Sequence, residues 1–381
     1  MVKRVLFLSY LGGLGGGETF LLNHLKALDR SRFDPIVLVA STGALVERLQ
    51  ALDIPVITLE FRNREGLAGR LHGMDLIKRL LKIIQQQKIE LLHLNDIELG
   101  KYGAIAARLA AIPVLWTCHG WWYAGRLREL FYRSMIDRIV MVSTMVRERL
   151  TERRIIPPSM ASVIHPGIDV ADYRLRPLDH SLKAEWDLGT DNLVIAIIGR
   201  FQPIKGHTNF LAAARLVYCS VPEARFLIVG GNVFGSSEDA THQARILAEV
   251  EADPELRSRV RFVGFQPDIT KVLSVVDVLV SASEAETFGM VHIEAMACER
   301  VVVSTDRGGP RDIVREGETG FLVPPSDPEA LANRIVQLCR EPRLRQRLGA
   351  AGRKRVEELF NTKHQVRRYE ALYDELLGIR P

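Results

Sequence analysis

The sequence predicts an α/β protein made of two doubly wound domains, each built on a parallel sheet. Runs rich in Val, Ile and Leu recur along the chain, and a helical pattern follows most of them. Most runs lack polar alternation, as is typical of strands that are covered on both faces. The strand–helix alternation implies parallel strands joined by right-handed crossovers. It runs through the chain twice, and 381 residues exceed what one ordinary core accommodates.

Eleven segments are expected to form the strands. In the first half they are RVLFLSY, DPIVLVAS, PVITLEF, ELLHLND, PVLWTCHG and RIVMVS, and in the second half LVIAIIGR, RFLIVGG, RVRFVGF, DVLVSAS and VVVSTDRGG. The segment 166–190 is rich in Pro, Gly and charge and lacks a long periodic pattern, so we place the domain junction there. The expected domains are residues 1–167 and 168–360, followed by a helical segment 361–381.

Composition narrows the class of protein. Hydrophobic residues make up 47% and charged residues 25% of the chain, and no apolar run approaches the roughly 18 residues of a membrane-spanning helix. We interpret the N-terminal MVKRVLFLSYLGG as a buried strand rather than a signal peptide, because no A-x-A-like site follows it. The cysteines Cys118, Cys219, Cys298 and Cys339 are scattered, which argues against structural zinc and favours a reducing, cytoplasmic setting.

The net charge of +5 is distributed unevenly. Residues 1–167 hold 23 Lys and Arg against 15 Asp and Glu, a balance of +8, whereas residues 168–381 hold 28 against 31, a balance of −3. A basic first half suits an anionic partner, such as a membrane surface or an acidic acceptor, and it equally suits plain solubility. No recognised nucleic-acid module is present, so we do not expect nucleic acid as a partner.

A glycine-rich loop follows the first expected strand. LGGLGGGETFLLNHLKAL lets backbone N–H groups approach an anion at a helix N-terminus, and it could also be a tight turn without a ligand. It is not a dinucleotide fingerprint, because the sixth position counted from Gly13 is Glu18 where that motif needs glycine. A Walker A motif is absent as well.

Two cations follow the first strand of the second half. In IAIIGRFQPIKGH, Arg200 comes directly after a strand end and a glycine, and Lys205 precedes Gly206 and a new helix. Two cations at a strand-to-helix turn can converge on a diphosphate, although a single Arg or Lys in a loop is usually only solvated.

Two glutamates eight positions apart, Glu286 and Glu294, stand in ETFGMVHIEAM. If the whole interval were helical, the carboxylates would lie about 12 Å apart along the axis. Glycosidase pairs lie roughly 5–9.5 Å apart, so a glycosidase-like acid/base pair is disfavoured. The spacing suits a long ligand with a carboxylate at each end and a helix N-terminus between them. The alternative is a solvent-exposed helix residue and a residue near the helix cap.

Taken together, these stretches resemble the retaining GT-B glycosyltransferases of family GT4, over nearly the whole chain. EAETFGMVHIEAMAC matches the family's E-x7-E pattern, and GRFQPIKGH, FVGF and GGPRDIVREGETGFLVPPSDPEALA follow in the family's order. GGGETFLLNHLKAL, HGWW and DRIVMVS are similar to the family too. The resemblance implies two Rossmann-like domains whose parallel sheets face each other across a cleft, with the last helix crossing back to the first domain. Asp312, Thr19 and the HPGID segment depart from the commoner residues.

The resemblance also implies roles for particular residues. Arg200 and Lys205 would bind the donor diphosphate, Glu294 the ribose hydroxyls, and Glu286 the transferred sugar. Further donor contacts would come from backbone N–H groups of Phe288, Gly289 and Met290, from Gly16 and Gly17 closing over the donor, and from His119 near the reacting carbon.

The expected activity is transfer of a hexose-type sugar, with retention, from a nucleotide-diphosphate sugar to a glycan or lipid-linked acceptor, in cell-surface polysaccharide or glycolipid synthesis. No Asp-x-Asp motif stands at a strand end, so we expect no essential metal and no cofactor. The alternatives are a non-catalytic nucleotide-sugar-binding scaffold and a sugar-nucleotide epimerase of GT-B architecture.

Aromatic and basic residues alternate in two first-half segments, which suits a membrane interface and equally suits interior aromatics beside a solvated face. They are Trp116, Trp121, Trp122, Tyr123, Arg126, Arg128 and Arg133 in one segment, and Arg62, Arg64, Arg70, Lys78, Arg79 and Lys82 in the other. We therefore expect a cytoplasmic protein that can lie at the cytoplasmic face of a membrane.

Overall fold

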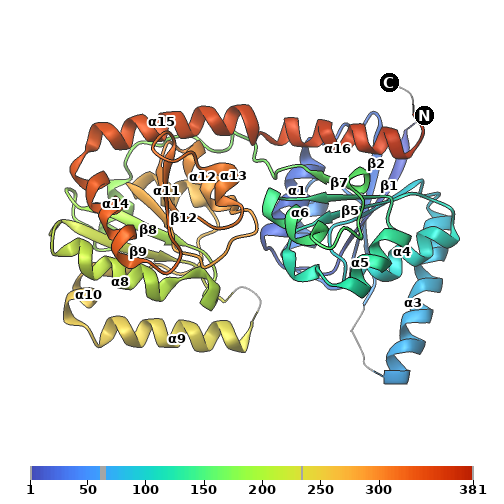
Figure 1. Ribbon diagram of the computed structural model, residues 1–381, viewed down its shortest axis with the longest axis horizontal. Helices are drawn as coiled ribbons and strands as arrows, with labels where there is room; N and C mark the ends of the chain where they lie inside the picture. Colours follow the sequence, from blue (N-terminus) through green and yellow to red (C-terminus); the bar gives the residue numbers. More distant parts are fainter. Residues whose placement is uncertain (1, 61–65, 233–234, 380–381) are drawn as a thin grey trace. The chain divides into compact units, whose positions relative to one another are not determined.

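The structure is a computed structural model that describes residues 2–60, 66–232 and 235–379, with the side chains of residues 66–71 left out. It divides into two compact units (Figure 1). Unit 1 comprises Met1–Gly167 and Thr362–Pro381, and unit 2 comprises Ile168–Asn361. The chain therefore returns to unit 1 for its last helix.

Unit 1 is a seven-stranded parallel sheet with the strand order β3-β2-β1-β4-β5-β6-β7. The strands are β1 (Lys3–Ser9), β2 (Phe33–Val39), β3 (Val56–Thr58), β4 (Leu91–Leu94), β5 (Val114–Cys118), β6 (Arg138–Met141) and β7 (Ala161–Val163). The strand order reverses at β1 and β4, and the carboxyl ends around such a reversal are where open α/β sheets bind ligands.

The helices of unit 1 connect these strands and cover both faces of the sheet (Figure 1). They are α1 (Gly16–Ala27), α2 (Ala44–Gln50), α3 (Gly66–Gln86), α4 (Gly100–Leu109), α5 (Arg126–Met135), α6 (Thr144–Thr151) and α16 (Thr362–Leu376), with 3-10 turns at Trp121–Tyr123 and Pro158–Met160. Alternate residues of β1 face opposite ways: Val5 and Phe7 pack with α1, α2 and α16, whereas Leu8 meets α4 so closely that Gly103 has no room for a side chain.

Unit 2 is a six-stranded parallel sheet with the order β10-β9-β8-β11-β12-β13. The strands are β8 (Leu193–Ile198), β9 (Ala224–Val229), β10 (Val260–Phe262), β11 (Val278–Ser281), β12 (Val301–Thr305) and β13 (Gly320–Val323). Here the strand order reverses at β8 and β11, so the loops after these two strands lie side by side at one edge.

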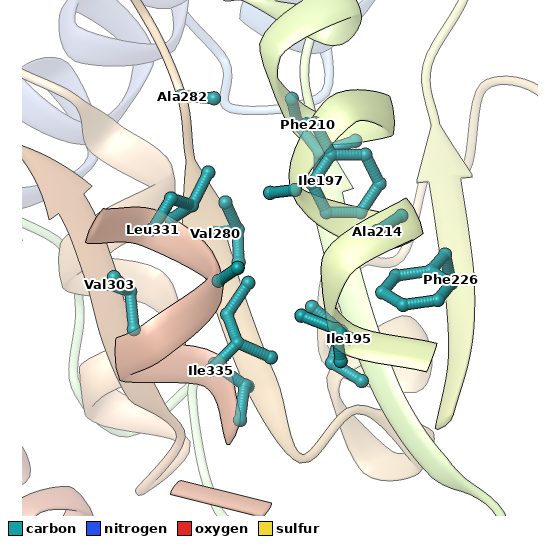
Figure 2. Close-up of a cluster of buried hydrophobic side chains, with 14 of the residues drawn as sticks. Ile195, Ile197, Phe210, Ala214, Phe226, Val280, Ala282, Val303, Leu331 and Ile335 are labelled. Carbon is teal, nitrogen blue, oxygen red and sulfur yellow. The ribbon is translucent and has the colours of Figure 1, made fainter. Parts of the chain in front are cut away.

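The helices of unit 2 also cover both faces. They are α7 (His180–Glu185), α8 (His207–Tyr218), α9 (Ser237–Glu251), α10 (Pro254–Arg259), α11 (Ile269–Val275), α12 (Met290–Ala297), α13 (Pro310–Ile313), α14 (Pro328–Arg340) and α15 (Pro342–Leu359), with a 3-10 turn at Pro203–Lys205. Figure 2 shows the core on one face, where Ile195 and Ile197 of β8 meet Phe210 of α8 and Ile335 of α14. The alternate β8 residues pack on the other face with α7 and α11.

The N-terminal caps of α8 and α12 differ from those of most other helices in unit 2. Five helices of unit 2 begin at a Ser or Asp whose side chain accepts a backbone N–H, namely α7, α9, α10, α11 and α14. In contrast, α8 and α12 begin at Gly206 and Gly289, both with positive φ and without a side chain that could cap the helix. Their first N–H groups are therefore left for another acceptor.

The two parallel doubly wound sheets predicted from the sequence are confirmed, but two edge strands were missed. β7 has three half-buried residues and β13 begins with a glycine, so neither shows the apolar run by which the other strands were recognised. Within the described ranges, no helix is long and apolar enough to cross a bilayer.

Candidate active site

The loops that follow β8 and β11 bring the predicted charged residues of unit 2 together. Arg200 lies two residues beyond the end of β8, and Lys205 closes the 3-10 turn that leads into α8. Glu286 lies in the loop between β11 and α12, while Glu294 is on α12 itself. Because β8 and β11 are neighbouring strands, their loops form one edge of the sheet.

Lys205 and Glu286 form the closest ion pair of this edge. The Nζ atom of Lys205 donates to Oε2 of Glu286 over 2.5 Å, and the side chains are 26% and 14% exposed. Burial alone would raise the pKa of Glu286, but the ammonium group outweighs this and holds the pKa below its ordinary value. Glu286 is therefore an anion at neutral pH, with one oxygen occupied by Lys205.

Arg200 has a looser carboxylate neighbour, which the sequence did not reveal. Its Nη1 atom lies 3.9 Å from Oδ2 of Asp239 in the first turn of α9, beyond hydrogen-bond distance. The Asp239 side chain is only 4% exposed. This buried carboxylate beside the guanidinium restrains Arg200 electrostatically.

The turns at Gly206 and Gly289 admit only glycine. Gly206 has φ +74°, and a Cβ atom there would lie 1.9 Å from the carbonyl oxygen of Ala282. Gly289 has φ +101°, and a Cβ atom would meet the ring of His292 at 2.4 Å. His292 is buried and bonds the Gly289 carbonyl through Nδ1 (3.1 Å) and the Ser304 hydroxyl through Nε2 (2.8 Å), which fixes the turn.

The glycine turn after β12 is attached to the same loop. The Gly309 N–H donates to the carbonyl of Glu286 (2.8 Å), and Glu286 and Gly308 form an isolated parallel bridge. A Cβ atom on Gly309 would lie 2.2 Å from Cα of Phe288, so the two backbones are in direct contact. Phe288 itself is 3% exposed and packs against the ring of Phe360. The loop from Glu286 to Gly289 is therefore supported on two sides.

Glu294 is held by a tyrosine far away in the sequence. The Tyr173 hydroxyl donates to Oε1 of Glu294 over 3.3 Å. Burial raises the pKa of Glu294 to about 7, and the Tyr173 hydrogen bond opposes part of this rise. Tyr173 is in turn held by Arg353, whose Nη1 donates to the Tyr173 carbonyl (2.9 Å). Glu294 is thus a half-buried carboxyl with a fixed orientation rather than a freely solvated helix residue.

The remaining predicted residues lie together in unit 1. Gly16 and Gly17 form the first turn of α1, and His119 directly follows β5. A Cβ atom on Gly17 would lie 3.5 Å from the His119 ring, and Nε2 of His119 lies 3.1 Å from Oδ1 of Asn95 after β4. Burial lowers the pKa of His119 to about 4, so the ring is neutral at pH 7.

The structure thus places the predicted residues in two groups. Arg200, Lys205, Glu286, Phe288, Gly289, Met290 and Glu294 share one edge of unit 2, and Gly16, Gly17 and His119 share one edge of unit 1. Sequence reasoning missed Asp239, Tyr173, His292 and Asn95, which hold these residues in place. In the portion of the chain that the structure describes, no three His, Cys, Asp or Glu side chains are grouped so that they could hold a metal ion.

Two family models match the chain. The model described as glycosyltransferase family 4 matches residues 14–172, and the model described as glycosyl transferases group 1 matches residues 180–355. The first lies within unit 1 for nearly all of its length, and the second lies within unit 2.

Curated relatives are glycosyltransferases as well. The chain is 28% identical to the putative glycosyltransferase EpsD of Bacillus subtilis over 79% of this chain and 82% of that protein. It is 23% identical to a UDP-Gal:alpha-D-GlcNAc-diphosphoundecaprenol alpha-1,3-galactosyltransferase of Escherichia coli, over 96% of this chain and 95% of the relative.

Solved structures show the same fold. A glycosyltransferase of Rickettsia africae matches with a TM-score of 0.87 at 22% identity, covering 100% of both chains. Anabaena Alr3699/HepE, solved with UDP and glucose, matches with a TM-score of 0.82 at 23% identity, covering 98% of this chain and 99% of that one. With both units matched by family models and each built on a parallel doubly wound sheet, the chain is a glycosyltransferase of family 4, with the GT-B fold.

Proposed function

We propose that this enzyme transfers a hexose-type sugar from a nucleotide-diphosphate sugar to a hydroxyl of a glycan or lipid-linked acceptor, with retention of the anomeric configuration. The observation that carries the proposal is the meeting of Arg200 and Lys205 with the uncapped first turns of α8 and α12 at one sheet edge. Cations and free N–H groups at one place suit a diphosphate.

In this proposal the diphosphate is the leaving group. Negative charge develops on it as the bond between the sugar's anomeric carbon and the phosphate oxygen breaks. Arg200, Lys205 and the helix N-termini stabilise that charge, Glu294 binds the ribose hydroxyls, and Glu286 accepts hydrogen bonds from the transferred sugar. Gly16 and Gly17 close over the donor, and His119 contacts the sugar. No metal or cofactor is part of the proposal.

Retention is proposed to occur by attack on the same face from which the leaving group departs. The acceptor hydroxyl forms the new bond to the anomeric carbon, and its proton passes to an oxygen of the departing phosphate. Membership of a retaining family supports this route, and no residue of the site is proposed as a covalent nucleophile.

The comparisons suggest which substrates to try first. The E. coli relative acts on UDP-galactose and a diphosphoundecaprenol-linked acceptor, and the Anabaena structures contain UDP, glucose or UDP-glucose. These names support UDP as the first nucleotide and an isoprenoid diphosphate-linked sugar as the first acceptor for this chain. They also support a role in cell-surface polysaccharide or glycolipid synthesis.

Calorimetric titration with UDP, GDP and ADP in the presence of a chelator tests the donor site. We expect one nucleotide to bind and Glu294→Ala to weaken it, by about tenfold or more if the ribose loses its carboxylate partner. Glu284→Ala is the control, since it removes an exposed carboxylate from the loop before α12. Binding that needs a divalent metal would contradict the metal-free proposal, and no binding of any nucleotide would favour a scaffold.

Turnover separates the remaining alternatives. With the nucleotide identified, incubation of its sugar conjugates with acceptor should give product and free nucleoside diphosphate. An epimerase would convert the sugar nucleotide without an acceptor, and a scaffold would bind it unchanged. The anomeric configuration of the product, read by proton coupling in NMR, tests retention directly.

A membrane-facing surface on unit 1 is the second part of the proposal. Leu127 and Leu130 on α5 are 83% and 47% exposed, Trp122 before the helix is 53% exposed, and Arg126 and Arg133 lie exposed beside them. The opposite side of α5 is buried. There the rings of Tyr132 and Trp116 pack together with their centroids 4.7 Å apart. Apolar tips among arginines suit an anionic membrane surface, and we propose a peripheral position on the cytoplasmic face.

The second predicted basic segment is only partly described. Arg62 and Arg64 lie outside the described residues, as does the side chain of Arg70, whereas Lys78, Arg79 and Lys82 are exposed on α3. Co-sedimentation with lipid vesicles at low salt tests this surface. The wild type should sediment with phosphatidylglycerol vesicles and should stay in the supernatant with phosphatidylcholine vesicles. Leu127→Gln should weaken binding, while Leu109→Gln, at a leucine on α4 that is 65% exposed, should not. Equal losses would contradict a role for α5.

A further inference from the structure

Asn95 connects three elements of unit 1 at the carboxyl end of the sheet. It follows β4, is 2% exposed, and contacts Nε2 of His119 through Oδ1 at 3.1 Å. Its Nδ2 atom donates to the carbonyl of Gly17 (3.3 Å) and lies 3.4 Å from the hydroxyl of Ser9. The side chain therefore touches the glycine turn of α1, the end of β1 and the histidine after β5 at once.

The contacts of Asn95 determine which way its amide is turned. A backbone carbonyl can only accept a hydrogen bond, so the atom of Asn95 that faces the Gly17 carbonyl has to be the NH₂ group. Turning the amide over would place two oxygens against each other at that distance. The carbonyl oxygen of Asn95 consequently faces His119, and it can only accept.

This orientation fixes the tautomer of His119. Because Oδ1 of Asn95 accepts, Nε2 of His119 carries the hydrogen, and in a neutral ring Nδ1 then has a lone pair. The His119 ring also packs against Phe20 and Gly17. The centroids of the His119 and Phe20 rings are 5.2 Å apart, and the ring planes meet at 72°. Across the described residues, no group is hydrogen-bonded to Nδ1, and the side chain is partly exposed.

We propose that Asn95 is a positioning residue that holds His119 as the Nε2–H tautomer, so that Nδ1 accepts a hydrogen bond from a hydroxyl of the sugar substrate. The identity of the ligand rests on the proposed function, whereas the tautomer does not. Without Asn95 the neutral ring would exchange between two tautomers, and one of them would present an N–H group to the hydroxyl's proton. The tether to Gly17 also ties the ring to the glycine turn that the donor proposal uses.

Nitrogen-15 NMR of the ligand-free protein labelled at histidine tests the tautomer without any variant in the measured sample. We expect His119 to show a protonated Nε2 and an unprotonated, pyridine-type Nδ1 at pH 7, with the signal assigned by its loss in His119→Gln. A protonated Nδ1, or averaged signals from both tautomers, would overturn the proposal. Because no substrate is needed, this result stands whether or not a nucleotide binds.

Kinetics of Asn95→Leu test the consequence, with Asn23→Leu as the matched control. Asn23 is a half-buried asparagine of the same unit, and among the described residues its amide donates only to the Gly167 carbonyl, at 3.4 Å. We expect Asn95→Leu to mix the tautomers and to lower kcat about tenfold while nucleoside diphosphate affinity changes less than about twofold. Unchanged turnover, or a loss equal to that of the control, would overturn the positioning role.

Acceptor-free hydrolysis of the donor assigns the hydroxyl. If the hydroxyl belongs to the transferred sugar, Asn95→Leu should slow hydrolysis and transfer alike. If it belongs to the acceptor, only transfer should slow. Hydrolysis and transfer that both match the wild type would refute the proposal, and a wild type that binds no nucleotide would refute the proposed function instead.

Discussion

The turn at Gly206 gives a prediction whose magnitude can be worked out from a matched pair of glycines. Gly206 and Gly317 have nearly the same positive φ, +74° and +71°. Among the described atoms, none lies within 4 Å of a Cβ built on Gly317, whereas one built on Gly206 would lie 1.9 Å from the carbonyl oxygen of Ala282. Replacing each by alanine therefore separates backbone strain from steric conflict.

Gly317→Ala should show the backbone strain alone. Placing a non-glycine residue in the left-handed region costs about 1–2 kcal/mol, and for a unit of this size each kcal/mol lowers Tm by about 2–4 °C. Gly206→Ala adds the conflict with a backbone carbonyl, for which overpacking costs of about 1–3 kcal/mol apply. The two effects together predict a loss of about 2–5 kcal/mol, because neither the helix α8 nor the Ala282 backbone can move away without disturbing the sheet edge.

The assay is thermal unfolding followed by circular dichroism, combined with nucleotide titration. Gly317→Ala should unfold slightly earlier and bind nucleotide normally. Gly206→Ala should unfold earlier still and lose nucleotide affinity, since Lys205 and the first turn of α8 shift with it. Equal changes in both variants would refute the argument that close approach to Ala282 sets the position of this turn.

Three further predictions concern buried polar groups. Burial raises the pKa of Glu294 from an ordinary 4.5 to about 7, so the folded state holds this proton more tightly than the unfolded state does. The free energy of unfolding should therefore fall by about 3 kcal/mol as the pH rises from 4.5 to above 7. In Glu294→Gln, the difference in urea midpoint between pH 4.5 and pH 7.5 should shrink accordingly. Ser304→Ala leaves Nε2 of buried His292 unpaired and should cost about 1–3 kcal/mol in urea unfolding, with an unchanged midpoint contradicting the bond. Tyr373→Phe removes the hydroxyl that bonds His93 (2.7 Å) and His24 (3.0 Å). It should speed amide hydrogen exchange in α16 more than elsewhere in unit 1, and an equal increase throughout the unit would argue against a local role.

The sequence predicted the charged residues of unit 2 because a parallel fold gathers strand ends. Arg200 and Lys205 follow one expected strand, and Glu286 follows another, so their meeting at one edge needed only the rule that loops after parallel strands share an edge. The same rule brought His119 next to the glycine turn of α1. Most of both sheets was predicted from apolar runs alone, apart from the two edge strands.

The supporting residues were not predictable in this way, because each contact joins distant parts of the chain. Tyr173 and Glu294 are 121 positions apart, and nothing near Tyr173 signals a partner. Asp239 lies in the first turn of α9, where acidic residues are common for reasons of helix polarity alone. Asn95 follows an ordinary buried strand, and only the structure shows which three groups it contacts. Side-chain partners at this range depend on packing geometry that no local pattern carries.

The pairing of Lys205 with Glu286 implies competition between the carboxylate and the phosphates of a donor. Lys205 cannot bind a diphosphate at full strength while its ammonium is 2.5 Å from Glu286. A neutral amide at position 286 should release Lys205, so Glu286→Gln should bind the free nucleoside diphosphate as tightly as the wild type or up to about tenfold more tightly.

Turnover of Glu286→Gln should nevertheless fall, because the proposed contact of the carboxylate with the sugar is lost. Isothermal titration and a transfer assay on the same preparation compare the two effects. If affinity for the nucleoside diphosphate instead fell together with turnover, Glu286 would be holding Lys205 in position for the phosphates rather than competing with them. The ion pair would then be part of the binding site as it stands, and donor binding would not need to break it.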